Sequence, residues 1–172
     1  MPRWLRYSIV LGIAALVVVL MLSFRRDPHD IRTGTVNKPA AAFTADKLDS
    51  TGTLSLKDYA GKVVVLNFFA SWCNPCIREL PALQAMSQRY KGRVHFVGVT
   101  FSDRREAAKS VLDRAGVEYP AAFDPSMSDV AYDYAVRVMP TTFFIGADGN
   151  LVERKDGEIN EVQLRTVIDR LF

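Results

Sequence analysis

An apolar run at residues 63–69 leads into the only two cysteines of the chain, Cys73 and Cys76. The run is rich in β-branched and aromatic residues and is short for a helix, so it predicts a buried strand. Apolar residues from Ile77 to Met86 recur every three positions and predict a helix after the cysteines. Cys73 would then lie where a strand ends and a helix begins, and a helix N-terminus stabilises a thiolate.

Two cysteines separated by two residues can close into a local disulfide after one of them, as a thiolate, has attacked another disulfide. The pair therefore predicts a reversible two-electron redox centre. Two other uses of the motif remain open. One is half of a zinc site, whose further ligands would have to come from His29 and His95. The other is a stapling disulfide, which such a small loop disfavours because its closure gains little entropy.

Residues 8–24 are almost wholly apolar, with Arg3 and Arg6 before them and arginines directly after them. A helix of this length reaches about 25 Å, at the short end for a bilayer. We expect a retained transmembrane signal anchor over residues 1–24, and a cleaved signal peptide is the alternative. A short basic N-terminus most often stays inside the cell, which would place the rest on the periplasmic or other extracytoplasmic side of the cytoplasmic membrane.

Residues 25–38 are polar, contain Pro28 and Gly34, and predict a tether. Residues 39–172 suit one domain with a single core. The formal net charge of +3 falls wholly before residue 37, because acidic and basic residues balance in the remainder. A balanced domain offers nucleic acid no electrostatic footprint, so we predict no nucleic-acid partner.

The domain begins with strand-like pieces around Phe43 and at residues 53–56, which predict an N-terminal hairpin. After the central strand and helix, residues 94–100 predict a second strand. Asp103 and Glu106 are spaced as a capping box for a helix that would follow this strand. A strand, a helix and a strand in that order imply a parallel pair with a right-handed crossover.

An inserted strand and helix are expected at residues 121–123 and 129–135. Residues 141–154 predict an antiparallel hairpin, and Asn160 with Gln163 would cap a final helix. These elements together predict an α/β fold, a mixed sheet covered by helices on both faces. In such sheets, functional sites gather at the carboxyl ends of the parallel strands, where Cys73 falls.

The motif Trp72-Cys73-Asn74-Pro75-Cys76, together with Met139-Pro140-Thr141-Thr142, resembles the thioredoxin fold. Within that fold, the chain is similar to the membrane-anchored TlpA, ResA and CcmG (DsbE) group of extracytoplasmic thiol-disulfide oxidoreductases. The resemblance runs from about Pro39 to the C-terminus and includes the N-terminal hairpin and the central insertion. It implies a redox-active disulfide in which Cys73 is the exposed nucleophile and Cys76 is the buried resolving thiol.

The resemblance also implies a substrate-binding surface. Pro140 corresponds to the family's cis-proline, which would lie against the cysteine pair and leave the backbone of Met139 free to pair with an extended substrate. A trans-proline that simply begins a strand is the alternative. Trp72 and Thr141 would complete the surface.

Glu79 lies three positions after Cys76 on the same helix face, where ResA-like members of the group place an active-site glutamate. Thioredoxin itself usually has a buried aspartate at the position of Asn67, which cannot titrate. We therefore expect Glu79 to be the acid/base partner of Cys76, and its charge to raise the thiol pKa values and make the pair reducing. A surface glutamate paired with a neighbouring Arg or Lys is the alternative.

The implied function is the reduction of disulfides in exported proteins, in particular the haem-binding cysteine pairs of apocytochromes c. A membrane thiol electron donor of the CcdA or DsbD type would resupply the electrons. The alternative is copper assembly, by reducing cysteine pairs of copper chaperones or cytochrome oxidase or by binding Cu(I). An oxidant is a third option, which the absence of histidine between the cysteines disfavours. No cofactor and no resident metal ion is expected.

Overall fold

The computed structural model describes Trp4, Tyr7 and residues 11–13, 36–125 and 130–172. The chain divides into two units, residues 1–30 and 31–172. A search of the described residues finds no helix with the length and apolar character that crossing a membrane requires. Most of the anchor expected at residues 1–24 and of the tether expected at residues 25–38 lies outside the described residues, so both stay predictions.

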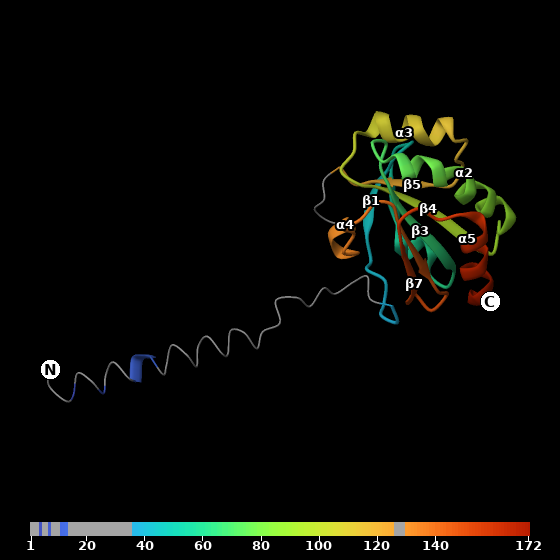
Figure 1. The fold of residues 1–172 in the computed structure, drawn as a ribbon. Coiled ribbons are helices and arrows are strands. Elements are labelled where there is room, and N and C mark those ends of the chain that lie inside the picture. The colour runs from blue at the N-terminus through green and yellow to red at the C-terminus, as the bar shows by residue number, and fades with distance from the viewer. Residues whose placement is uncertain (1–3, 5–6, 8–10, 14–35, 126–129) are drawn as a thin grey trace. The chain divides into compact units, whose positions relative to one another are not determined.

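The second unit is built on a mixed sheet (Figure 1). Within the described part of the chain, seven strands form this sheet in the order β2-β1-β5-β4-β3-β6-β7. β3, β4 and β5 are parallel to one another, while β1 and β6 are antiparallel to the strands they flank. The strands are β1 (Thr44–Lys47), β2 (Thr53–Ser55), β3 (Val63–Phe69), β4 (Val94–Thr100), β5 (Ala121–Phe123), β6 (Thr141–Ile145) and β7 (Leu151–Asp156). The predicted mixed sheet, parallel pair and terminal hairpins are confirmed.

The strand β3 lies at the centre of the domain, and all of its residues are buried. Val63, Val65 and Phe69 face one core cluster, while alternate residues such as Leu66 face another. Because helices or loops cover both faces, the strand must be apolar throughout, which explains the sequence run that predicted it. Asn67 is the one polar residue of the strand.

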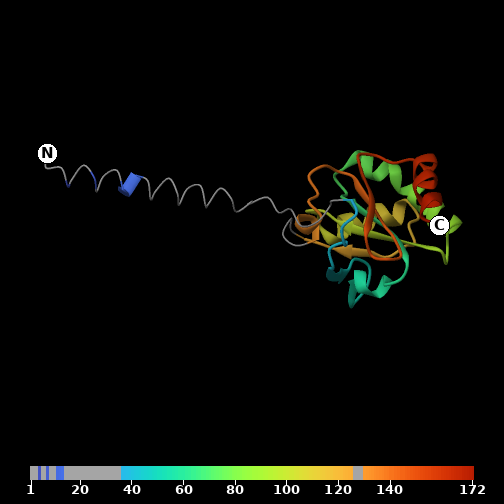
Figure 2. The same ribbon diagram turned by 90° about the horizontal axis from the view of Figure 1, so that it is seen from below.

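Helices cover both faces of the sheet. On one face lie α2 (Asn74–Arg89), α3 (Arg105–Arg114) and α5 (Glu161–Ile168), whose buried residues join the first core cluster. α2 packs against α5, and Figures 1 and 2 both show the two helices side by side. On the other face lie α4 (Val130–Asp133) and the 3₁₀ turn η1 (Leu56–Tyr59). A second 3₁₀ turn, η2 (Asp169–Leu171), follows α5.

The helix ends differ in how well the sequence predicted them. Asn160 and Gln163 form the expected capping box of α5. The box expected from Asp103 and Glu106 is wrong, because Arg104 is the N-cap of α3 and its side chain makes no capping hydrogen bond. The carboxylate of Asp103 binds a more distant partner in the candidate site.

Candidate active site

Three loops meet at the carboxyl end of β3. The first follows β3 itself and carries the cysteines. The second follows β4, and the backbone N–H of Phe101 donates to the carbonyl of Phe69 at 2.9 Å. The third precedes β6, whose first residue, Thr141, pairs with Phe68 near the end of β3. The fold thus brings the segment around Pro140 to the edge of the sheet that carries Cys73, as the sequence predicted.

Cys73 and Cys76 form a disulfide with a Cα–Cα distance of 5.2 Å. Cys73 is the N-cap of α2, and its Sγ accepts a hydrogen bond of 3.3 Å from the backbone N–H of Cys76. Pro75 occupies the first turn of the helix, where a missing N–H costs nothing.

The two cysteines differ in accessibility, but less than expected. Cys76 is fully buried, as predicted, whereas Cys73 is 5% exposed. The expectation of an exposed Cys73 is therefore wrong for the disulfide form. The sulfur of this N-cap residue accepts from a backbone N–H of the helix, and Cys73 packs in the core cluster that α2 shares with α3 and α5. Cys73 is still the more exposed of the two residues.

Glu79 is buried, with 1% of its surface exposed. Its Oε1 accepts a hydrogen bond from Asn67 Nδ2 at 2.7 Å, and its Oε2 accepts one from the backbone N–H of Ile159 at 2.9 Å. The carboxyl group thus connects α2 to β3 and to the loop before α5. The alternative of a surface glutamate paired with a basic neighbour is wrong, because the adjacent Arg78 binds Glu158 instead.

Burial raises the pKa of Glu79 to about 7. The hydrogen bonds from Ile159 and Asn67 favour the carboxylate and oppose this rise, while the negative charge of Glu158 adds to it. Residues three positions apart are neighbours on a helix surface, so Glu79 lies next to Cys76 on α2. A carboxyl group that titrates near neutrality therefore accompanies the buried cysteine.

The sequence did not reveal the part played by Asn67. Its Nδ2 donates both to Glu79 and, at 3.0 Å, to Thr142 Oγ1 on β6. Its Oδ1 is buried and, in the part of the chain that the structure describes, has no hydrogen-bond partner. A single polar residue in an otherwise apolar strand was the available signal, because a buried amide needs partners. No sequence signal marks the backbone of Ile159.

The loop before β6 contains a cis peptide bond between Met139 and Pro140, which confirms the predicted cis-proline. Met139 is half-buried against both core clusters. In residues 130–172 and the other described segments, no hydrogen bond engages the backbone of Met139, so it remains free for an extended partner.

Thr141 does not present its side chain to a substrate. It is fully buried, and its Oγ1 lies 2.6 Å from the carbonyl oxygen of Val138 and 3.0 Å from Asp156 Oδ1. The hydroxyl therefore holds the turn that leads into β6. Met139 and Trp72 are left as the accessible side chains of the expected surface.

Trp72 is 55% exposed, and its indole ring contacts the loop after β4. Its Nε1 donates to the carbonyl of Ser102 at 3.1 Å, and its ring meets Phe101 edge-on. Asp103 accepts hydrogen bonds from both the backbone N–H and the hydroxyl of Ser71. This contact fixes the residue before Trp72 and explains why Asp103 does not cap α3.

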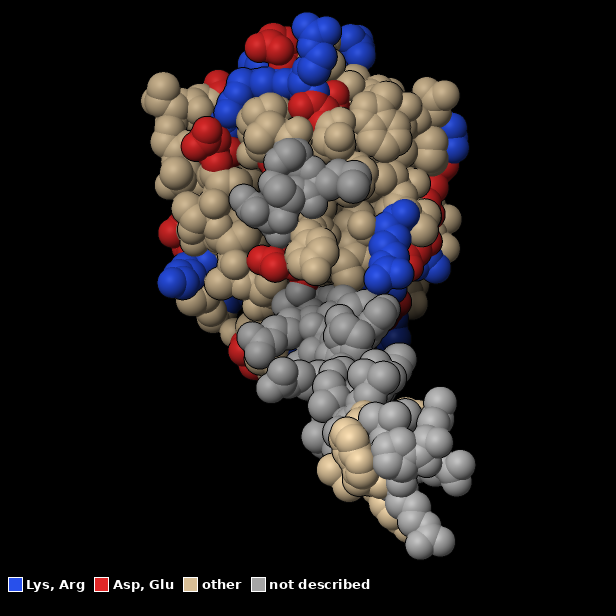
Figure 3. Space-filling model, turned by 90° about the vertical axis from the view of Figure 1, so that its left-hand side faces the viewer, with Lys and Arg blue, Asp and Glu red and all other residues tan. Residues whose placement is uncertain are grey.

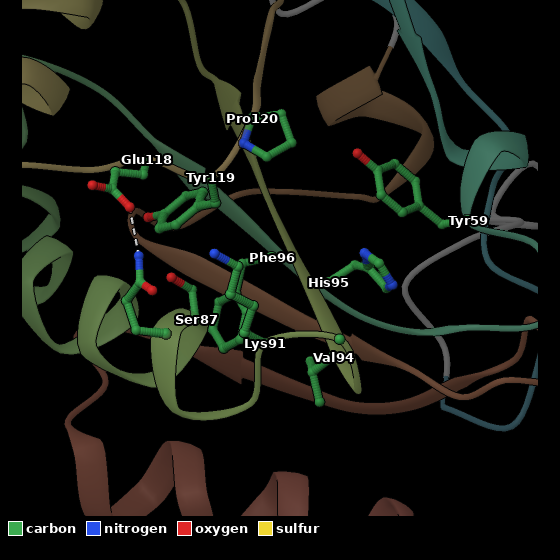
Figure 4. A pocket seen from close by; sticks show the side chains of 11 residues that line it. Tyr59, Ser87, Lys91, Val94, His95, Phe96, Glu118, Tyr119 and Pro120 are labelled. Carbon is green, nitrogen blue, oxygen red and sulfur yellow. Dashed lines mark hydrogen bonds between the residues drawn. The ribbon is translucent and has the colours of Figure 1, made fainter.

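A separate hollow of about 330 Å³ lies at the other end of β4. Figure 4 shows it lined by residues from the end of α2 and the loop after it, from the start of β4, and from the segment before β5, with Tyr59 of η1. His95 packs here against the ring of Tyr59, and burial and the charge of Lys62 lower the pKa of His95. Because β3 and β4 are parallel, this hollow is at the opposite edge of the sheet from the disulfide. His95 therefore cannot join the cysteines in a zinc site.

The described residues contain no group of three or more His, Cys, Asp or Glu side chains placed to hold a metal ion. On the face of the domain drawn in Figure 3, basic and acidic side chains are interspersed around a broad area of uncharged residues. The charges on that face therefore do not gather into a patch of one sign.

A redox disulfide at a helix N-terminus, beside a cis-proline loop on the neighbouring strand, defines a thioredoxin-like protein that exchanges thiols and disulfides. Residues 36–154 match the AhpC/TSA family, and the chain belongs to this family.

The names of its relatives describe the same reaction. A thiol-disulfide oxidoreductase ResA of Bacillus thuringiensis is 31% identical over 137 residues, which cover 79% of this chain and 78% of the relative. A thiol:disulfide interchange protein DsbE of Allochromatium vinosum is 32% identical over 158 residues, which cover 90% of this chain and 86% of the relative.

Solved structures agree with this assignment. A putative DsbE from Chlorobium tepidum aligns with a TM-score of 0.71 and 29% identity, covering 80% of this chain and 100% of that one. A DsbF homologue from Corynebacterium diphtheriae gives a TM-score of 0.72 and 29% identity, covering 78% of this chain and 87% of that one. The chain is thus a thiol-disulfide oxidoreductase of the ResA and DsbE type, as the sequence predicted.

Proposed function

We propose that this protein reduces disulfides of exported proteins on the extracytoplasmic side of the cytoplasmic membrane. The observation that supports a reducing role is the buried carboxyl group of Glu79, which titrates near neutrality next to the resolving cysteine. A negative charge beside a thiol raises the thiol pKa and disfavours the thiolate. Because a stabilised thiolate favours the reduced pair, its loss makes the pair a better electron donor.

The reaction uses the two sulfur atoms in turn. The thiolate of Cys73 attacks one sulfur of a substrate disulfide, forms a mixed disulfide and releases the other substrate sulfur as a thiolate. Cys76 then loses its proton to the carboxylate of Glu79. The Cys76 thiolate attacks the Sγ of Cys73, which closes the protein disulfide and releases the second substrate thiolate. Two electrons pass to the substrate, and the released thiolates take up protons.

The substrate class we favour is the haem-binding cysteine pair of an apocytochrome c. The free backbone of Met139 suits a partner segment that carries such a pair in an extended conformation. Trp72 and Met139 offer accessible apolar contacts beside Cys73. The relatives ResA and DsbE are named for thiol-disulfide exchange, the reaction that this substrate class requires.

The proposed cellular setting follows from the N-terminal sequence. The apolar segment at residues 8–24 would anchor the protein in the membrane, and the tether at residues 25–38 would leave the domain free to turn. A membrane dithiol donor of the CcdA or DsbD type would reduce the Cys73–Cys76 disulfide after each turnover. Its dithiol would be oxidised as this disulfide is opened.

Trapping the mixed disulfide tests the proposal. In the full-length Cys76→Ser variant, Cys73 remains to attack a substrate, but the thiol that releases the substrate is absent. We expect apocytochromes c to be captured through Cys73 in cells that make them, and to be absent from the matched Cys73→Ser control. Capture of copper-assembly proteins in their place, or no capture above the control, would contradict the proposal.

A further inference from the structure

We propose that Asn67 is a positioning residue for Glu79, whose side-chain amide turns over when Glu79 gains or loses a proton. Its NH₂ group would face the carboxylate, and its carbonyl oxygen would face the carboxylic acid. The inference rests on the proposed role of Glu79 as the acid/base partner of Cys76.

The structure shows the arrangement that suits the carboxylate. Asn67 Nδ2 donates to Glu79 Oε1, 2.7 Å away, and to Thr142 Oγ1, 3.0 Å away. The N–H of Ile159 holds the other carboxylate oxygen at 2.9 Å. Both oxygens of Glu79 therefore accept a hydrogen bond, while Asn67 Oδ1 has no hydrogen-bond partner among the residues described. A buried acceptor left without a partner destabilises the folded protein.

The same arrangement does not suit the carboxylic acid. Since the N–H of Ile159 occupies Oε2, the added proton belongs on Oε1, the oxygen that faces Asn67. There it would meet the NH₂ group, donor against donor, because a protonated carboxyl group carries an O–H that must donate.

A half-turn of the Asn67 amide removes the contact between the two donors without moving the backbone, and it places the NH₂ group where Oδ1 lies in this structure. The carbonyl oxygen then takes the place of the NH₂ group and accepts from the O–H of Glu79. It also accepts from the hydroxyl of Thr142, whose proton has no acceptor in the described ranges. Aspartate or leucine at position 67 offers no such exchange. Ionised aspartate carries only acceptors, and leucine carries neither a donor nor an acceptor.

The other groups around Glu79 do not replace this partner. Cys76 neighbours it on α2, and the charge of Glu158 faces it from the loop before α5. The hydroxyl of Tyr119, before β5, is buried, and burial together with the charge of Glu79 raises its pKa. β3 and β6 contribute only the neutral Asn67 and Thr142. The basic neighbour Arg78 is engaged by Glu158 at the surface.

The first test titrates Glu79 by ¹³C NMR of its carboxyl carbon in the oxidised full-length protein, in which the cysteines do not titrate. Asn67→Leu removes a partner of both protonation states, but the hydrogen bond to the charged carboxylate is the stronger of the two, so the pKa of Glu79 should rise by about one pH unit, a tenfold change in proton affinity. The matched control is Thr142→Val, which should shift the pKa much less because Thr142 bonds to Asn67 and not to Glu79. Equal shifts in the two variants, or no shift in Asn67→Leu, would overturn the proposal.

A second measurement needs no variant and so does not depend on Asn67→Leu folding. In the wild-type protein, the nuclear Overhauser effect between the Asn67 NH₂ hydrogens and Thr142 Hβ should be present well above the titration midpoint and lost well below it. An unchanged effect on both sides of the midpoint would overturn the turnover of the amide.

A kinetic test separates a positioning role from a merely structural one. Asn67→Leu should displace the pH profile of disulfide reduction in the wild-type background and leave it unmoved in the Glu79→Gln background. A displacement in both backgrounds would contradict action through Glu79. The two NMR measurements use no substrate, so a failure of the proposed physiological function would leave them intact and could be told apart.

Discussion

Replacing Glu79 with Gln should remove most of the pH dependence of stability that the wild-type protein shows between about pH 4.5 and 7. The pKa of Glu79 rises from its ordinary value of 4.5 to about 7 in the folded state. Between these values the folded protein binds a proton that the unfolded chain has already lost. The free energy of unfolding is therefore highest below about pH 4.5 and falls as the pH rises through 7.

The size of the effect follows from the shift. A separation of about 2.5 pH units at 1.36 kcal/mol per unit corresponds to a loss of about 3 kcal/mol. That loss is a large part of the 5–15 kcal/mol that stabilises a typical domain. The lowered pKa of His95 acts in the opposite direction, but it is present in both proteins and cancels in their comparison.

The assay is urea unfolding of the oxidised full-length protein and of Glu79→Gln at a series of pH values from 4 to 8.5. We expect the free energy of unfolding of the wild type to fall by about 3 kcal/mol relative to that of the variant across this range. Glutamine keeps the shape of the side chain and cannot ionise, so it isolates the charge. Parallel pH curves for the two proteins would refute the reasoning, since they would show that Glu79 ionises in the folded state as readily as in the unfolded chain.

Two further predictions concern the site itself. Glu79→Gln should slow disulfide reduction by roughly a hundredfold or more and remove the inflection near pH 7 from its rate profile, as stopped-flow reduction of a model disulfide can measure; an unchanged profile would contradict the acid/base role. Asp103→Ala should cost about 2 kcal/mol in urea unfolding and lower the fluorescence anisotropy of Trp72, because Ser71 loses its partner. The alanine variant of Asp113, an exposed helix residue, is the control, and equal effects in both variants would contradict the assignment.

The features that the sequence predicted correctly depend on local patterns. An apolar run predicts the central strand. The helical spacing from Cys76 to Glu79 places both residues on one helix face. The inserted strand and helix were also expected from the local pattern, whereas the cis-proline came from the resemblance. These signals were enough to place the redox pair at the correct edge of the sheet.

The contacts that the sequence could not predict join distant residues. Glu79 binds Asn67, which is 12 positions away, and Ile159, which is 80 positions away. No local sequence spacing predicts either hydrogen bond. Asp103 has a local signal for helix capping, but its carboxylate accepts two hydrogen bonds from Ser71, 32 residues earlier, instead. The low exposure of Cys73 likewise follows from its packing in the core cluster that α2 shares with α3 and α5.

The backbone N–H of Ile159 bonds to the carboxyl group of Glu79, so this distant amide is sensitive to whether Glu79 carries a proton. When a peptide N–H loses or weakens its acceptor, its hydrogen is replaced by deuterium from the solvent more readily. The deuterium uptake at Ile159 therefore reports on the state of Glu79 from the segment that leads into the last helix. Such a measurement leaves both sulfur atoms untouched and needs no dye or tag.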